Sequence, residues 1–209
     1  MISYRSLFAI GLFLVAVPTI AQSGSGGVAP NQALRTFDDP AYKITFEFPA
    51  DYTFTRNDHE ISTFALDARF GAKNTIMRAV AAMPRNPFPA STFSGAYFYF
   101  SVTPHSSAPA CASQASVHTA DGRSPKPKPG ERMQLNGIPF THGHDEQREV
   151  CITQRDEIYT TLRRGTCYRF DLAINTFCGE ASGVKDITPQ ELDEVERRLQ
   201  AILSTARFQ

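Results

Sequence analysis

Two runs of apolar and β-branched residues meet at the dipeptide Arg164-Gly165, one over 157–163 and the other over 166–174. A tight turn at this dipeptide predicts an antiparallel hairpin in which the numbers of paired residues add up to 329. This register places Tyr159 opposite Phe170 and puts large apolar side chains on both faces of the hairpin. A chain with such a hairpin needs a core on each side of its sheet.

Residues 1–21 have the composition of a cleavable secretory leader. Arg5 gives a positive start, 7–17 is an uncharged apolar run, and the small residues Thr19 and Ala21 suit a cleavage site. The apolar run has eleven residues, whereas a membrane-spanning helix needs roughly 20. We therefore expect cleavage after Ala21, a secreted or periplasmic location, and no transmembrane segment after cleavage.

The sequence has four cysteines, and none of them forms a Cys-x-x-Cys pair. An even number of cysteines in an exported chain predicts two disulfides. Extending the hairpin register outward, across a turn expected at 154–156, brings Cys151 opposite Cys178. Of the three pairings that four cysteines allow, the register favours Cys151–Cys178 together with Cys111–Cys167.

Removal of the leader leaves 188 residues, with 20 basic and 21 acidic side chains. This length suits one domain, which we place at 37–209 after a flexible lead-in over 22–36. A balance of charge near zero argues against nucleic acid as a partner, because nucleic acids are bound through an excess of positive charge.

Alternating or β-rich patterns predict further strands over 42–48, 52–55 and 95–103. Aromatic residues on both faces of the strand over 95–103 indicate that it lies in the interior of the sheet. The segment 75–82 fits either a short buried strand, which we favour, or a helix through Ile76, Val80 and Met83. Asn136-Gly137 predicts a second hairpin at a sheet edge. We expect an irregular or briefly helical segment over 61–70. A long loop follows over 104–130, which ends in the Pro-rich tract 124–129.

The chain closes with an amphipathic helix that begins at Thr188-Pro189, where Glu191 completes a capping box. Leu192, Val195 and Leu199 follow at helical spacing. Together these elements predict an α+β fold, in which an antiparallel β-sheet is flanked by helices as an α/β/α sandwich and is stapled by disulfides.

Three segments resemble the PsbP-like superfamily, which includes exported PsbP and DcrB-type proteins: the opening strand 42–52, the hairpin near 157–174 and the closing helix that runs into 204–208. The resemblance implies a sheet between helices and an accessory or binding role without catalysis. The chain departs from the pattern at Tyr52, where bacterial members often have Trp. Its cysteines and the 104–130 loop suggest a narrower exported subgroup.

The segment Thr141-His142-Gly143-His144-Asp145-Glu146 is the one constellation with ligand chemistry. On a strand, His142 and His144 project from one face, and two imidazoles at this spacing can share a zinc or copper ion. Asp145, Glu146 or a distant histidine would have to complete the shell. The alternative is an ordinary strand in which Gly143 marks a bulge.

Three functions follow from these observations. The leading one is an exported, non-enzymatic accessory or binding domain for an unidentified protein or small ligand, without a cofactor. The second is a metal-binding protein that uses His142 and His144. The third is a secreted hydrolase, which requires a serine, a histidine and a carboxylate in one pocket although no nucleophile-elbow motif occurs. A catalytic thiol at Cys167 is disfavoured by disulfide pairing.

Overall fold

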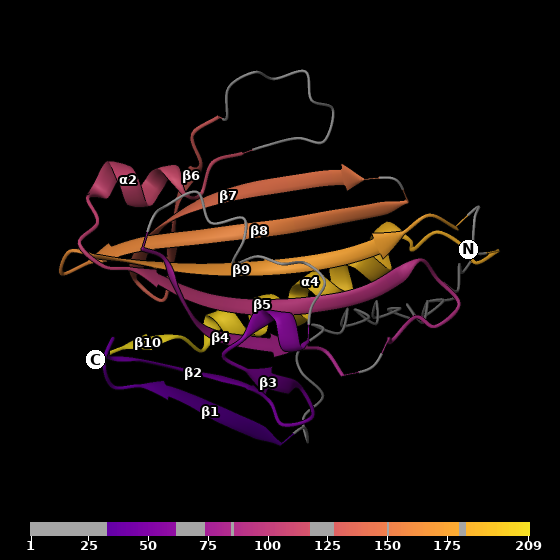
Figure 1. The fold of residues 1–209 in the computed structure, drawn as a ribbon, viewed down its shortest axis with the longest axis horizontal. Coiled ribbons are helices and arrows are strands. Elements are labelled where there is room, and N and C mark those ends of the chain that lie inside the picture. Colours follow the sequence, from indigo (N-terminus) through magenta and orange to yellow (C-terminus); the bar gives the residue numbers. More distant parts are fainter. Residues whose placement is uncertain (1–32, 62–73, 85, 118–127, 150, 180–182) are drawn as a thin grey trace, which may run out of the picture.

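The computed structural model describes residues 33–61, 74–84, 86–117, 128–149, 151–179 and 183–209. The predicted leader, most of the lead-in, nearly all of 61–70 and part of the Pro-rich tract lie outside these residues. Within them, the chain forms a large and a small antiparallel sheet, two α-helices and one 3-10 turn, η1 (Asp58–Glu60) (Figure 1). None of the described helices is long and apolar enough to cross a membrane.

The large sheet has seven antiparallel strands, in the order β3 (Thr53–Thr55), β4 (Ile76–Ala82), β5 (Phe93–Thr103), β9 (Thr166–Phe177), β8 (Ile152–Arg163), β7 (Ile138–Glu149) and β6 (Glu131–Leu135). The prediction of an interior strand over 95–103 is confirmed, because β5 lies between β4 and β9. Its aromatic side chains are buried on both faces: Phe98 and Phe100 on one and Tyr99 on the other.

The predicted register of the β8–β9 hairpin is confirmed along its whole length, from Arg163 opposite Thr166 to Ile152 opposite Phe177. The turn expected at 154–156 was wrong, since both strands continue through this region without interruption. Just beyond the last pair lies the disulfide Cys151–Cys178, and a second disulfide joins Cys111 to Cys167. These are the two pairs that the register favoured.

The small sheet contains β1 (Leu34–Asp39), β2 (Ile44–Pro49) and the last strand, β10 (Arg207–Phe208), with β2 in the centre. Within the described residues, the first strand begins at Leu34, inside the segment expected to be a flexible lead-in. The reason is pairing with β2, in which Leu34 lies opposite Pro49. Residues 34–36 are exposed, so their side chains carried no strand signal.

Helix α4 (Pro189–Ser204) has the predicted capping box: the Thr188 side chain accepts a hydrogen bond from the Glu191 amide, and the Glu191 carboxylate accepts one from the Thr188 amide. The apolar side of α4 packs on the same face of the large sheet as the small sheet does (Figure 1). Phenylalanines from both sheets join this core, among them Phe46 and Phe170. We call this the core face of the large sheet.

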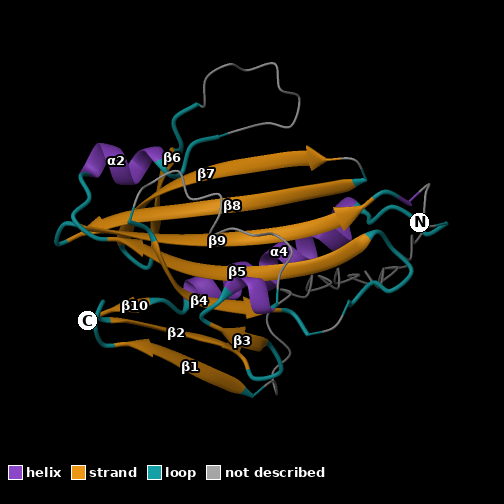
Figure 2. Cartoon of the chain, in the orientation of Figure 1, coloured by secondary structure: helices purple, strands orange, loops and turns teal. Residues whose placement is uncertain are grey.

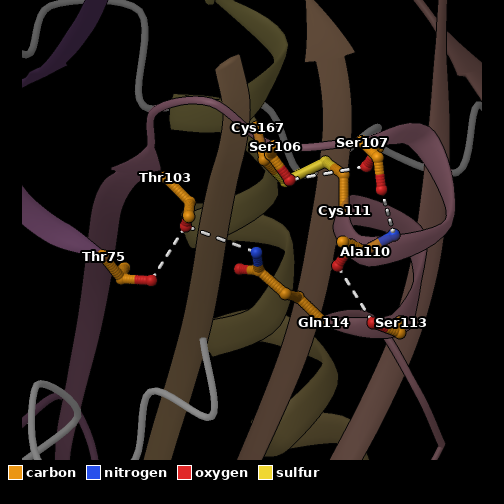
Figure 3. Close-up of a disulfide and its surroundings, with 9 residues drawn as sticks. All are labelled: Thr75, Thr103, Ser106, Ser107, Ala110, Cys111, Ser113, Gln114 and Cys167. Atoms are coloured by element: carbon orange, nitrogen blue, oxygen red, sulfur yellow. Dashed lines mark hydrogen bonds between the residues drawn. A yellow bond between two sulfur atoms is a disulfide. The ribbon is translucent and has the colours of Figure 1, made fainter. Parts of the chain in front are cut away.

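The opposite face carries helix α2 (Ala108–Ser113), which the sequence analysis missed within its long loop. The Ser107 side chain caps this helix by accepting a hydrogen bond from the Ala110 amide, and Cys111 fastens it to Cys167 of β9 (Figure 3). The predicted α+β class with an antiparallel sheet is confirmed. The predicted α/β/α sandwich is only partly matched. Helix α4 shares the core face of the large sheet with the small sheet, and α2 lies at one end of the opposite face (Figure 2).

Candidate functional site

The two histidines of the predicted metal motif lie two residues apart on β7, on the core face of the sheet. Side chains two residues apart on a strand lie on the same face, and Phe140, two residues before His142, is buried in the core. On the neighbouring strand β8, Tyr159 lies opposite His142 and Glu157 lies opposite His144. The His142 ring stacks on the ring of Tyr159, with centroids 4.5 Å apart. The strand geometry therefore places both imidazoles beside the carboxylate of Glu157.

The Glu157 carboxylate bridges the two imidazoles. Its Oε2 lies 2.6 Å from His142 Nε2, and its Oε1 lies 2.5 Å from His144 Nδ1. Burial alone would raise the pKa of Glu157, but the hydrogen bonds with His142 and His144 outweigh it and lower the pKa to about 2. The hydrogen bond with Glu157 in turn raises the pKa of His144 above its usual value, against the effect of burial. We call these three residues the His–Glu–His cluster.

The predicted metal ligands are only partly brought together. Glu146 reaches within 4.0 Å of His144 Nε2, whereas Asp145 projects from the other face because side chains alternate along a strand. Across the described ranges, no group of three or more His, Cys, Asp or Glu residues is arranged to hold a metal ion. The imidazole nitrogens that face Glu157 form hydrogen bonds with it, and metal binding stays a prediction.

The interpretation of Gly143 as a bulge was wrong. β7 pairs with β8 without a shift of register at this residue, and Gly143 lies directly opposite Ile158. A Cβ atom at position 143 would lie 2.0 Å from the main-chain oxygen of Ala115. Glycine is needed here because the chain that follows α2 passes directly over β7.

A groove with a volume of about 350 Å³ lies next to the His–Glu–His cluster, between the sheet and the first half of α4. We call it the α4 groove. Its lining combines aliphatic side chains with charged ones: Arg155, Glu157, Leu172, Ile174, Ile187, Pro189, Leu192, Asp193 and Glu196. Leu172 and Ile174 are buried on β9, so the apolar part of the groove stands on the rigid centre of the sheet.

Three carboxyl groups and one guanidinium group surround this apolar surface. Glu157 belongs to β8, while Asp193 and Glu196 come from α4. Burial raises the pKa of Glu196, and the negative charge of Glu157 raises it further. An added cation would relieve the repulsion between these two carboxylates. The α4 groove is therefore suited to an apolar group that carries a positive charge.

The sequence analysis found the histidines but missed Glu157 and Glu196. Finding Glu157 required the register between β7 and β8, which pairs Glu149 with Ile152. Val150 and Cys151 connect these strands, and neither is a typical hairpin-turn residue. Glu196 lies within a correctly predicted helix, but its neighbours depend on how that helix lies on the sheet.

A separate group of charges is buried on the face opposite to the core face. Arg169 Nε donates hydrogen bonds of 2.8 and 3.0 Å to the two carboxylate oxygens of Asp171. Asp156 is 3% exposed. Burial, followed by the charge of Asp171, raises the pKa of Asp156 well above its usual value. Arg169 also lies 3.9 Å from the Asp156 carboxyl group, so one buried guanidinium serves both aspartates and we regard this group as structural.

Two of the catalytic alternatives gain no support from these contacts. All four cysteines of the sequence form disulfides, so no thiolate nucleophile exists in this state. His142 and His144 direct their hydrogen bonds to Glu157 and not to a serine hydroxyl. The hydrolase hypothesis therefore stays without an identified nucleophile and base.

No protein-family model matches the sequence. The search of curated proteins also finds no match. Among solved structures, a protein of Bacteroides thetaiotaomicron VPI-5482 aligns over 83% of this chain with 8% identity and a TM-score of 0.44. The aligned region is 48% of that protein, so this chain spans about half of its length.

Two other solved structures align over nearly their full length. Cyanobacterial PsbP (CyanoP) from Synechocystis sp. PCC 6803 has 12% identity and a TM-score of 0.44, over 90% of this chain and 99% of the other. The Ran-binding protein Mog1p of Saccharomyces cerevisiae has 10% identity and a TM-score of 0.43, over 85% and 96%. Similarity at this level assigns neither family nor function, and the resemblance to the PsbP-like superfamily remains a prediction.

Proposed function

We propose that this chain is an exported, non-enzymatic binding domain and that the α4 groove is its ligand site. The observation that carries the proposal is the groove itself, with its volume of about 350 Å³. Ligand sites are concave, largely apolar and supplied with a few well-placed polar groups. The α4 groove is concave and combines aliphatic with charged side chains. It rests on a central strand and a capped helix, so it needs little reorganisation to accept a ligand.

The disulfides support the exported part of the proposal, because such bonds persist in oxidising compartments. The predicted leader lies outside the described residues and adds a sequence argument only. The charge of the groove indicates the ligand: a small molecule or peptide side chain that joins a cationic group to an aliphatic stem. A nucleic acid would meet three carboxyl groups at this site.

The test is an NMR titration of the disulfide-bonded protein with hexylamine and with hexanoate, two probes of equal length and opposite charge. We expect hexylamine to shift the amide signals of Leu172, Ile174 and Leu192, and hexanoate to leave them unchanged. Leu192→Arg should abolish the shifts, because its positive charge repels the cationic probe and its side chain covers the apolar surface. Leu34→Arg, at an exposed leucine outside the groove, is the matched control. Equal responses to both probes would contradict the proposal.

A second candidate function is metal binding at the His–Glu–His cluster. The observation that favours it is the placement of His142 and His144 on one face of β7, next to the carboxylate of Glu157. Zinc or copper binding would have to replace the present hydrogen bonds. Metal analysis of protein purified without a histidine tag, compared with a His142→Ala/His144→Ala variant, decides between the two. Equal and negligible metal content in both proteins would end this hypothesis.

A further inference from the structure

A second concavity, with a volume of about 220 Å³, lies where the β1–β2 turn, the β8–β9 turn and strand β10 meet. Its walls combine three aromatic rings with three basic side chains: Ala41, Tyr42, Lys43, Arg163, Arg164, Thr166, Tyr168, Phe208 and Gln209. We call it the basic pocket. Thr166 and Tyr168, at the start of β9, line the basic pocket, whereas Leu172 and Ile174, further along the same strand, line the α4 groove.

Two of its basic residues occupy turn positions that rarely carry long side chains. Lys43 has a φ of 52° and Arg164 a φ of 49°, both in the left-handed region that favours glycine or asparagine. Such positions fix the direction in which a side chain leaves the backbone. The two turns therefore present a lysine and an arginine to the same small volume, beside Arg163 at the end of β8.

The positive charge of the basic pocket is not neutralised by its surroundings. Neither aspartate nor glutamate lines it, and no ion pair within the described residues involves Lys43, Arg163 or Arg164. The nearby carboxylate of Asp39 is bonded to Arg78 at 2.6 Å. A free α-carboxylate on Gln209 would offset one of the three charges and leave an excess of two.

The aromatic walls are held in place by specific contacts. The Tyr168 hydroxyl donates a hydrogen bond of 2.8 Å to the main-chain oxygen of Tyr42, and the two rings meet edge to face. Phe208 meets Tyr168 in the same way, with ring centroids 5.0 Å apart. The guanidinium of Arg163 lies over the Phe208 ring, 4.6 Å from its centroid. These contacts give the pocket a preformed aromatic surface below its cations.

We propose that the basic pocket binds a small anionic ligand in which a carboxylate or phosphate group is attached to a single ring. Guanidinium groups bind both anions through paired hydrogen bonds, and the aromatic walls supply an apolar surface for the ring. The volume of about 220 Å³ lies below the roughly 300 Å³ of sites for drug-sized molecules. It is large enough for one ring with its anionic group.

The test is isothermal titration of the full, disulfide-bonded chain with four probes: benzoate, phenyl phosphate, benzylamine and inorganic phosphate. We expect benzoate or phenyl phosphate to bind and benzylamine to be rejected. Inorganic phosphate should bind at least about tenfold more weakly than phenyl phosphate, because it leaves the aromatic walls uncovered. Equal binding of the two phosphates would overturn the assignment of a ring, and binding of benzylamine would overturn the assignment of an anion.

Two variants locate the site without disturbing the turns that form it. Lys43→Asn and Arg164→Asn keep a residue that tolerates positive φ, so thermal unfolding should stay unchanged. Each should weaken binding by about tenfold, the loss expected for one charge-assisted hydrogen bond. Arg132→Asn on β6, away from the pocket, is the control and should bind as the native chain does. Unchanged affinity in the Lys43→Asn/Arg164→Asn double variant would overturn the proposal.

Discussion

The charge of Glu157 gives the sharpest prediction about stability. Glu157→Gln keeps the size of the side chain and removes its charge, while the two imidazoles stay in place. In the native chain, the pKa of Glu157 is lowered from 4.5 to about 2. A shift of this size, at about 1.36 kcal/mol per unit, corresponds to about 3 kcal/mol. The side chain is 21% exposed, so we expect about 2 kcal/mol after screening by water.

This stabilisation has a defined pH window. A lowered carboxyl pKa stabilises the fold above the unfolded value of 4.5, and the contribution is lost as the pH falls toward 2. A raised imidazole pKa stabilises the fold below the unfolded value of 6.5, and the contribution is lost as the pH rises through the folded pKa of His144. The native chain should therefore exceed Glu157→Gln in stability most strongly between pH 4.5 and 6.5. At pH 8.5 only about 1 kcal/mol should remain, from the hydrogen bonds that neutral imidazoles donate to the Glu157 carboxylate.

The assay is urea unfolding followed by circular dichroism, with both disulfides intact, at about pH 3, 5.5 and 8.5. Glu47→Gln is the control, because Glu47 is an exposed carboxylate on β2. It should shift the unfolding free energy by less than about 0.5 kcal/mol at every pH. A difference between the native chain and Glu157→Gln that does not change with pH would refute the reasoning.

Several further substitutions have expected outcomes that thermal or urea unfolding can measure. Asp156→Asn should stabilise the fold by about 1 kcal/mol at pH 8, and the gain should vanish near pH 3, because a raised carboxyl pKa stabilises only the protonated form. Arg169→Met should instead cost about 3–5 kcal/mol, since it leaves Asp171 buried without its partner. A loss of stability for Asp156→Asn at pH 8, or no loss for Arg169→Met, would contradict this account of the buried charges. The two disulfides close loops of 56 and 27 residues, and each limits the conformational entropy of the unfolded chain. Replacing Cys111 and Cys167 by Ala should therefore cost about 4 kcal/mol, and replacing Cys151 and Cys178 by Ala about 3.5 kcal/mol. A loss under about 1 kcal/mol for either pair would contradict this entropic explanation. Gly143→Ala should cost about 3 kcal/mol, because the added Cβ atom would clash with backbone atoms of Ala115. Gly137→Ala, where a Cβ atom meets nothing, should cost about 1 kcal/mol. Equal losses would show that the chain over β7 can move aside.

The best sequence predictions concerned contacts between neighbouring segments. The Arg164-Gly165 turn fixes the pairing of β8 with β9, and this register led to the cysteine pairs seen in the structure. The capping residues of α4 gave its first residue in the same way. In both cases the determining interactions lie within a few residues of a recognisable turn or cap.

Elements that depend on distant partners were missed. Strand β1 forms because it pairs with β2. Its first half is exposed, so the sequence shows no alternation of apolar and polar residues there. α2 has only six residues and is fastened by Cys111 to a strand 56 positions away. The same limit applied to the candidate site. The common face of His142 and His144 follows from strand geometry, whereas Glu157 and Glu196 join them through tertiary packing alone.

The small sheet has a consequence for biosynthesis. β2 pairs on one side with β1 and on the other with residues 207–208, which are made some 160 positions later. Until those residues leave the ribosome, β2 presents an unpaired edge and the core beneath it stays open. The small sheet can therefore be completed only after residues 207–208 have been made. For the export proposed above, this delay would be useful, because the small sheet stays incomplete while the earlier part of the chain is translated.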